Sequence, residues 1–311
     1  MTTPKAKFAG LALIAAVCAG FTLGLTAPAW AGLKEGAAAY QRGDYATAIR
    51  ELRPLAKQGN AAAQNILGFM YKRGEGVPQD YARAVKWYRK AAEQGLADAQ
   101  NSLGVMYGEG QGVPQDDAEA AKWFRKAAEQ GIPKAQFNLG LMYAKGKGVP
   151  QDDAKALQWW RKAAEQGLAD AQNSLGVMYE RGQGVPQDDA EAAKWYRKAA
   201  EQGNAIAQYN LGLMYDNGQG VPQDHAEAVR WYRKAAEQGY STAQNLLGLM
   251  YVLGKGIRRD YIQAHMWLNL AAATGDEDED ARKNRDIVAK KMTPAQISEA
   301  QKLAREWRPK K

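Results

Sequence analysis

Residues 62–97 read AAQNILGFMYKRGEGVPQDYARAVKWYRKAAEQGLA, and this pattern returns along the chain with a period of 36 residues. A Leu-Gly pair and a Trp mark the register of each copy, at Gly68, Gly104, Gly140, Gly176, Gly212 and Gly248 and at Trp87, Trp123, Trp159, Trp195, Trp231 and Trp267. A fixed period of this length predicts a solenoid, because each unit can bury its apolar face only against its neighbours.

Each copy predicts two helices joined by a loop. Both halves of 62–97 carry a one-sided apolar stripe at helical spacing. Gly74, Gly76 and Pro78 interrupt the chain between the halves. Asp80 then suits an N-cap, since its carboxylate can accept hydrogen bonds from the free N–H groups of the next turn. We therefore expect antiparallel pairs of helices, each about 12–15 residues and about 20 Å long.

The glycine of each Leu-Gly pair lies inside the first helix. Glycine costs a helix interior about 1 kcal/mol relative to alanine, so its return in every copy needs a physical reason. We expect a close helix approach there, in which the Trp and Tyr of the second helix pack onto the space that a side chain would fill. The Trp, Tyr, Met and Ala columns are accordingly predicted to form the core.

The motifs A-x-A-Q-x-x-L-G-x-M-Y, G-x-G-V-P-Q-D and A-x-x-W-Y-R-K-A-A-E-Q-G resemble the Sel1-like repeat family, whose members are related to tetratricopeptide repeats. The resemblance implies an all-α, right-handed α-solenoid of antiparallel helix pairs. We divide the chain into a signal peptide at 1–31, an N-terminal tetratricopeptide-like unit at 32–61, six Sel1-like repeats at 62–277 and C-terminal capping helices at 278–311.

The N-terminal segment predicts export. Lys5 and Lys7 precede an apolar run that begins at Phe8, and the small residues of Ala29-Trp30-Ala31 suit cleavage before Gly32. A retained membrane anchor is the alternative, since the run is near the lower length limit for a spanning helix. Cys18 is the one cysteine, so a cleaved chain forms no disulfide. We expect a periplasmic or secreted protein whose mature chain does not span a membrane.

The charge is basic, with a formal net value of +8. Much of it comes from an Arg-Lys pair that follows the aromatic pair in five of the repeats, such as Arg89-Lys90 and Arg197-Lys198. One interpretation is a solvated helix face. The other is a basic stripe that meets an acidic polymer or a lipid surface. Nucleic acid is not expected as a partner of an exported chain.

The residues predict no enzyme, no cofactor and no metal site. The histidines, His225 and His265, stand forty residues apart, and neither belongs to a cluster with metal-ligand spacing. None of the serines begins an S-x-x-K motif or sits in G-x-S-x-G. Some cysteine-rich Sel1-like proteins are described as β-lactamases; their paired cysteines are absent here, so that activity is the least favoured alternative.

A partner-binding groove is predicted on the first helices, because the resemblance implies that these line the concave face. Asn side chains can hold a peptide backbone by both donor and acceptor, and aromatic and apolar side chains can take up those of the peptide. A block of two repeats was recently duplicated within the chain, so identity between its copies records ancestry. Positions that differ from the equivalent positions of other repeats are therefore more informative about binding. The predicted groove residues are Asn65, Phe69, Asn101, Lys134, Phe137, Asn173, Ile206, Tyr209 and Asn245. The alternative is that Asn only tolerates a solvated helix face.

These observations predict an exported, non-enzymatic repeat scaffold that binds a protein or peptide. The resemblance implies an envelope adaptor or regulator, since Sel1-like proteins of the bacterial envelope regulate sensor proteins, exopolysaccharide assembly and cell-wall enzymes. A cell-wall or acidic-polysaccharide binder that uses the basic stripe is the alternative. Strong salt sensitivity of binding would favour that alternative.

Overall fold

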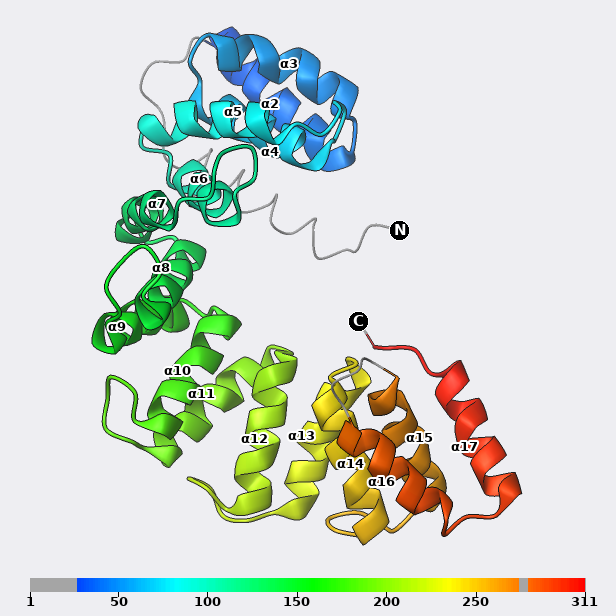
Figure 1. Ribbon diagram of the computed structural model, residues 1–311. Helices are drawn as coiled ribbons and strands as arrows, with labels where there is room; N and C mark the ends of the chain where they lie inside the picture. Colours follow the sequence, from blue (N-terminus) through cyan, green and yellow to red (C-terminus); the bar gives the residue numbers. More distant parts are fainter. Residues whose placement is uncertain (1–26, 274–278, 311) are drawn as a thin grey trace. The chain divides into compact units, whose positions relative to one another are not determined.

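The computed structural model describes residues 27–273 and 279–310, and over these ranges the chain forms helices and loops without strands (Figure 1). The all-α solenoid expected from the repeat is confirmed. The helices are α2 (Ala27–Arg42), α3 (Tyr45–Lys57), α4 (Ala61–Arg73), α5 (Tyr81–Glu93), α6 (Ala97–Glu109), α7 (Asp117–Glu129), α8 (Pro133–Lys145), α9 (Asp153–Glu165), α10 (Ala169–Arg181), α11 (Asp189–Glu201), α12 (Ala205–Asn217), α13 (His225–Glu237), α14 (Ser241–Leu253), α15 (Tyr261–Ala272), α16 (Glu279–Ala289) and α17 (Pro294–Glu306).

The chain divides within α9 into two compact units, one ending at Trp159 and the other beginning at Trp160. In the first unit α2 packs on α3, α4 on α5 and α6 on α7, and in the second α10 packs on α11, α12 on α13 and α14 on α15. Each pair also contacts the next pair in its unit, as α5 does with α6. Contacts between neighbours therefore build each unit, as a solenoid requires.

The predicted caps are confirmed. The Asp80 carboxylate accepts from the Arg83 backbone N–H at 2.8 Å, and the same bond recurs at Asp116 and Asp188. The first helix of the repeat ends at Gly74, whose φ of +70° is left-handed backbone that favours glycine. The boundaries of both helices are thus set by local side-chain and backbone chemistry.

The glycine inside each first helix does lie at a close helix approach. A Cβ at Gly68 would stand 2.7 Å from the ring of Tyr88, and one at Gly176 would stand 2.6 Å from the ring of Tyr196. The expectation that the Trp also packs onto this space was wrong. Trp123 instead belongs to a core cluster that includes Tyr71 and Tyr88 of the preceding repeat together with buried side chains of its own repeat. The Tyr closes its own repeat, and the Trp joins the repeat to the one before it.

The loop glycines do more than form the predicted hairpin turn. Gly112, in the second glycine position of G-x-G, has a φ of +73°, and a Cβ there would stand 2.3 Å from the carbonyl carbon of Tyr81. Gly220 similarly approaches the carbonyl oxygen of Asp189. Each loop therefore rests on the first turn of the second helix in the preceding repeat. Only a residue without a side chain fits at this contact, because backbone atoms cannot move aside.

Buried glutamines connect the repeats through hydrogen bonds. The side-chain amide of Gln64 donates to the carbonyl of Ala56 in the preceding unit at 2.9 Å, and it accepts from Gln94 of its own repeat at 2.8 Å. The same donation to a preceding second helix recurs at Gln100, Gln136, Gln172, Gln208 and Gln244. Each of these helix-end carbonyls also accepts a backbone bond, as Ala56 does from the Gly59 N–H at 3.2 Å, so the glutamine adds a second bond that crosses between repeats.

The two ends of the chain are closed differently. The predicted signal peptide lies largely outside the described residues, and the predicted cleavage point before Gly32 falls within α2, just ahead of the buried Leu33. At the other end Thr293 and Gln296 form a capping box at the start of α17. Trp307 meets Trp267 edge to face, with ring centroids 6.2 Å apart. Residues 27–273 and 279–310 include no helix that is both long and apolar enough to cross a membrane.

Candidate functional site

The predicted groove residues all lie on first helices. Because the chain forms two units, they make two separate sets. The first set is Asn65 and Phe69 on α4, Asn101 on α6, and Lys134 and Phe137 on α8; the second is Asn173 on α10, Ile206 and Tyr209 on α12, and Asn245 on α14.

The Asn column links neighbouring helices. Asn101 accepts a hydrogen bond from Asn138 on α8 at 3.3 Å, and Asn173 accepts one from Asn210 on α12 at 3.1 Å. Asn245 likewise accepts from Asn284 on α16 at 3.1 Å. Asn65 differs from the other three in burial, since it is only 4% exposed whereas they are half-buried. The Asn column therefore contributes to packing between first helices, which was not expected from the sequence. The donors Asn138 and Asn210 directly follow Phe137 and Tyr209, and this spacing was the available signal.

Two of the aromatic groove residues also pack within the protein. The ring of Phe69 stands 6.0 Å from that of Tyr40, and the Arg73 guanidinium lies 5.3 Å from the Phe69 ring centroid. The ring of Tyr209 stands 5.3 Å from that of Tyr240. Phe69 and Tyr209 therefore take part in packing as well as in the predicted groove. Phe137 is half-buried.

Lys134 and Ile206 occupy the same register on α8 and α12, and both are exposed. The corresponding residue is Asp98 on α6 and Asp170 on α10. Burial raises the pKa of Asp98, while the Lys134 ammonium acts to lower it. Ile206 is 47% exposed, one turn before Tyr209. At this register the first unit thus has the cation Lys134 on α8, and the second unit has the apolar Ile206 on α12, where α6 and α10 have a carboxylate.

The pattern that defines the Sel1 repeat matches residues 61–96, 97–132, 133–168, 169–204, 205–240 and 241–276. The chain belongs to the Sel1 repeat family. Sel1 repeats form scaffold folds that typically mediate protein binding. Comparison with curated proteins gave no match.

Solved Sel1 structures resemble this one. A Sel1 repeat protein from Oxalobacter formigenes is 36% identical, with a TM-score of 0.72, over 82% of this chain and 100% of its own. A protective antigen of uropathogenic Escherichia coli strains, which has an SLR fold, is 31% identical with a TM-score of 0.50, over 96% of this chain and 94% of its own.

The basic pairs of the Sel1 repeats are engaged in packing. Arg89 donates to the Tyr107 hydroxyl of the next repeat at 2.6 Å, and the same bond recurs from Arg125, Arg161, Arg197 and Arg233. The lysine stacks on the Trp of its own repeat, with the Lys198 Nζ 4.0 Å from the Trp195 ring centroid. The Arg-Lys column therefore stabilises the packing between Sel1 repeats, and its charge is not wholly available to a ligand.

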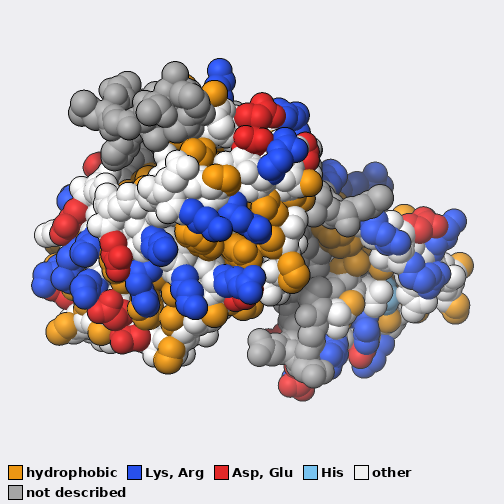
Figure 2. All heavy atoms as spheres, turned by 90° about the horizontal axis from the view of Figure 1, so that it is seen from above, with side chains coloured by type: hydrophobic (Ala, Val, Ile, Leu, Met, Phe, Trp, Pro, Cys, Tyr) orange, Lys and Arg blue, Asp and Glu red, His pale blue; other side chains and the backbone are white. Residues whose placement is uncertain are grey.

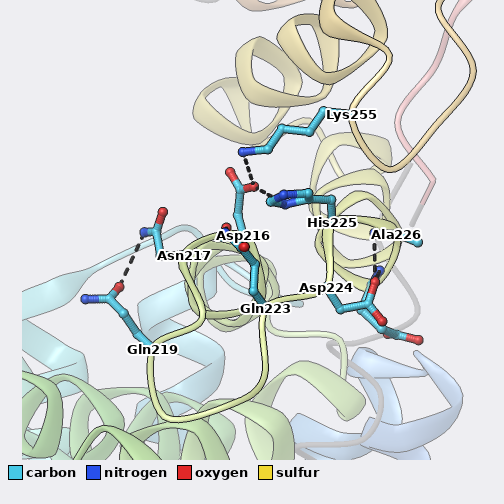
Figure 3. Close-up of polar contacts among 9 residues, drawn as sticks. Asp216, Asn217, Gln219, Gln223, Asp224, His225, Ala226 and Lys255 are labelled. Carbon is cyan, nitrogen blue, oxygen red and sulfur yellow. Dashed lines mark hydrogen bonds and ion pairs between the residues drawn. The ribbon is translucent and has the colours of Figure 1, made fainter.

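One Sel1 repeat carries an ionic cluster that the sequence analysis did not identify (Figure 3). Asp216, near the end of α12, lies 2.9 Å from the Nδ1 atom of His225 and 3.0 Å from the Nζ atom of Lys255. His225 begins α13, and Lys255 lies in the loop of the following repeat. The cluster thus joins two repeats, and His225 takes part in it through a structural contact with Asp216.

The other histidine is part of the core. His265 on α15 is 3% exposed. Burial lowers its pKa, and the Arg285 guanidinium on α16 lowers it further, against the opposing charge of Asp286. Among the residues that the structure describes, no three or more His, Cys, Asp or Glu side chains gather as potential metal ligands.

Proposed function

We propose that this protein is a non-enzymatic envelope adaptor or regulator that binds a protein or peptide partner on the face of its first helices. The observation that carries the proposal is Ile206, a large apolar side chain that is 47% exposed beside the half-buried Tyr209. Exposed apolar groups beside aromatic rings are typical anchors in protein interfaces. The linked amides of Asn173 on α10 and Asn210 on α12 supply polar groups on neighbouring first helices.

The sequence itself supplies substitutions that should preserve the fold. Ile206→Asp introduces the residue that Asp170 provides at the same register of α10, so α12 should tolerate it. Lys134→Asp is the equivalent change in the first unit, where α6 carries Asp98. A matched control is Leu253→Asn, because Leu253 is 61% exposed at the end of α14 and α12 ends with Asn217.

The test is crosslinking capture from the native envelope, followed by a binding assay with the purified captured partner. We expect Ile206→Asp to reduce its affinity by about 2 kcal/mol, roughly thirtyfold. Leu253→Asn should bind as the unchanged chain does, and all variants should melt alike. A partner that binds Ile206→Asp and Lys134→Asp at full strength would contradict the proposed face.

Export is part of the proposal and has its own test. Leu33 is the first core residue of α2 and is 2% exposed, while Trp30 is 36% exposed. Cleavage before Gly32 would therefore keep Leu33 and the later core residues of α2. Intact mass spectrometry of the protein from the periplasm or medium should give a chain that begins at Gly32. A mass that includes the first 31 residues would support a retained anchor.

A further inference from the structure

A basic hollow lies on the first Sel1 repeat, mainly on its second helix, and none of the predicted groove residues lines it. It has a volume of about 600 Å³ and is lined by Tyr71, Arg83, Lys86, Trp87, Arg89, Lys90 and Glu93. Its size falls within the roughly 300–1,000 Å³ of pockets that hold small molecules. The hollow can therefore take a short stretch of a polymer.

The charge of this hollow sets α5 apart from the other second helices. Arg83 and Lys86 occupy the register at which α7 has Glu119 and Lys122, and those two side chains pair at 2.9 Å. The pair recurs on α11 between Glu191 and Lys194. On α5 an arginine replaces the acid, so Lys86 lacks the carboxylate that its counterparts have. Four basic residues stand on α5 against Glu93 alone, whereas α7 carries three bases and three acids.

The aromatic floor of the hollow is also unusual. Trp87 is half-buried, whereas Trp123 is 7% and Trp231 is 7% exposed. The Lys90 Nζ stands 5.1 Å from the Trp87 ring centroid, compared with 4.0 Å for the lysine above Trp231. An indole that is less covered can offer part of its face to a ligand. Trp159 is half-buried as well, but Gln158 replaces the lysine beside it.

Three of the four cations in the hollow already have partners, and one of them is Lys90, which lies over the Trp87 ring. Arg89 donates to Tyr107, and Arg83 pairs with Asp80 at 3.1 Å and lies over the Tyr71 ring. Lys86 is exposed beside Trp87. The groups that remain to meet a ligand are thus the Lys86 ammonium, the part of the Arg83 guanidinium that Asp80 and Tyr71 do not contact, and the part of the Trp87 ring that Lys90 leaves uncovered. Exposed Lys and Arg side chains with hydrophobic side chains between them are also evident on the face of the molecule in Figure 2.

We propose that this hollow binds a short stretch of an acidic polysaccharide. The flat apolar face of a uronate ring would stack on Trp87, and its carboxylate would pair with Lys86, with Arg83 as the second cation. A hollow favours a discrete chain over a bilayer surface. An aromatic ring face suits the flat apolar face of a sugar better than the flexible carboxylate side chains of an acidic peptide.

Isothermal titration calorimetry with an oligogalacturonide and the purified full chain tests the proposal. Lys86→Gln introduces the residue found at Gln158, and Lys194→Gln removes the equivalent lysine of α11 as the matched control. We expect binding that weakens about fivefold in Lys86→Gln, as an exposed ion pair of about 1 kcal/mol implies. Lys194→Gln should bind at full strength, and a neutral maltooligosaccharide should bind more weakly than the oligogalacturonide.

Several outcomes would overturn the proposal. Absence of oligogalacturonide binding would do so, as would an equal loss in Lys86→Gln and Lys194→Gln. A polyglutamate peptide or anionic phospholipid vesicles that bind as tightly, with the same dependence on Lys86, would show that the ligand class is wrong. Ile206→Asp should leave oligogalacturonide binding intact, so the failure of this site is distinguishable from the failure of the partner-binding face.

Discussion

At the scale of single residues, glycine in a helix interior decides how closely two helices approach. Gly176→Ala should destabilise the protein, because the new Cβ would stand 2.6 Å from the ring of Tyr196, and overpacking costs about 1–3 kcal/mol. Gly108→Ala is the matched control. Its Cβ would meet only Ala120 at 3.7 Å, so the helix propensity gain of up to about 1 kcal/mol should remain. Thermal melts of both variants should move in opposite directions, and a stabilised Gly176→Ala would refute the close approach.

His265 should make stability depend on pH. The folded protein holds its pKa below the ordinary value of about 6.5, so the unfolded chain takes up a proton first as the pH falls. Stability is therefore complete above that value and declines below it. His265→Val introduces the residue that Val229 provides at the same register, which is 3% exposed. Urea unfolding at pH 7 and pH 5 should show a smaller loss in His265→Val than in the unchanged protein. Equal losses of stability in the two proteins between pH 7 and pH 5 would show that His265 does not cause the pH dependence.

At the scale of the helix, stability depends on hydrogen bonds that cross from one repeat to the next. Gln208→Ala should destabilise by about 1–3 kcal/mol, since it removes a buried bond to the Ala200 carbonyl and the acceptor of the Gln238 amide. The Ala200 carbonyl then keeps only backbone bonds such as that from Gly203. Gln223→Ala removes a bond of the same kind to Asp216, at 2.8 Å but in solvent. Water can replace that bond, so the loss should be well below 1 kcal/mol. Chemical denaturation measures both, and similar losses would show that the buried bond has no special role.

At the scale of the whole molecule, nearest-neighbour contacts predict that a repeat can be removed. Deletion of residues 205–240 would bring α14 onto α11, where Gln244 could reach the carbonyl of Ala200 in place of that of Ala236. A shorter chain with cooperative unfolding and a lower melting temperature is expected. Deletion of α12 alone should abolish cooperative unfolding in the second unit, because α13 loses its pair. Circular dichroism melts distinguish these results, and loss of cooperativity in the full-repeat deletion would contradict the repeat frame.

The sequence by itself determined the repeat, its two helices and their ends. These features are local: Asp80 caps the helix that follows it, and Gly74 ends the helix that precedes it. The apolar stripes likewise show which faces are buried. The candidate groove residues could be placed on first helices for the same reason.

Only the tertiary structure decided what the polar residues that recur at one position of each repeat contact, namely the Arg, Gln and Asn columns. Arg89, Gln64 and Asn101 each form a hydrogen bond to a neighbouring repeat, and the second loop glycine packs on backbone more than thirty residues away. A period shows that two residues are equivalent, but it does not show which side chains of adjacent repeats meet. That depends on how one helix pair stacks on the next, and this stacking separates the packed Tyr209 from the exposed Ile206.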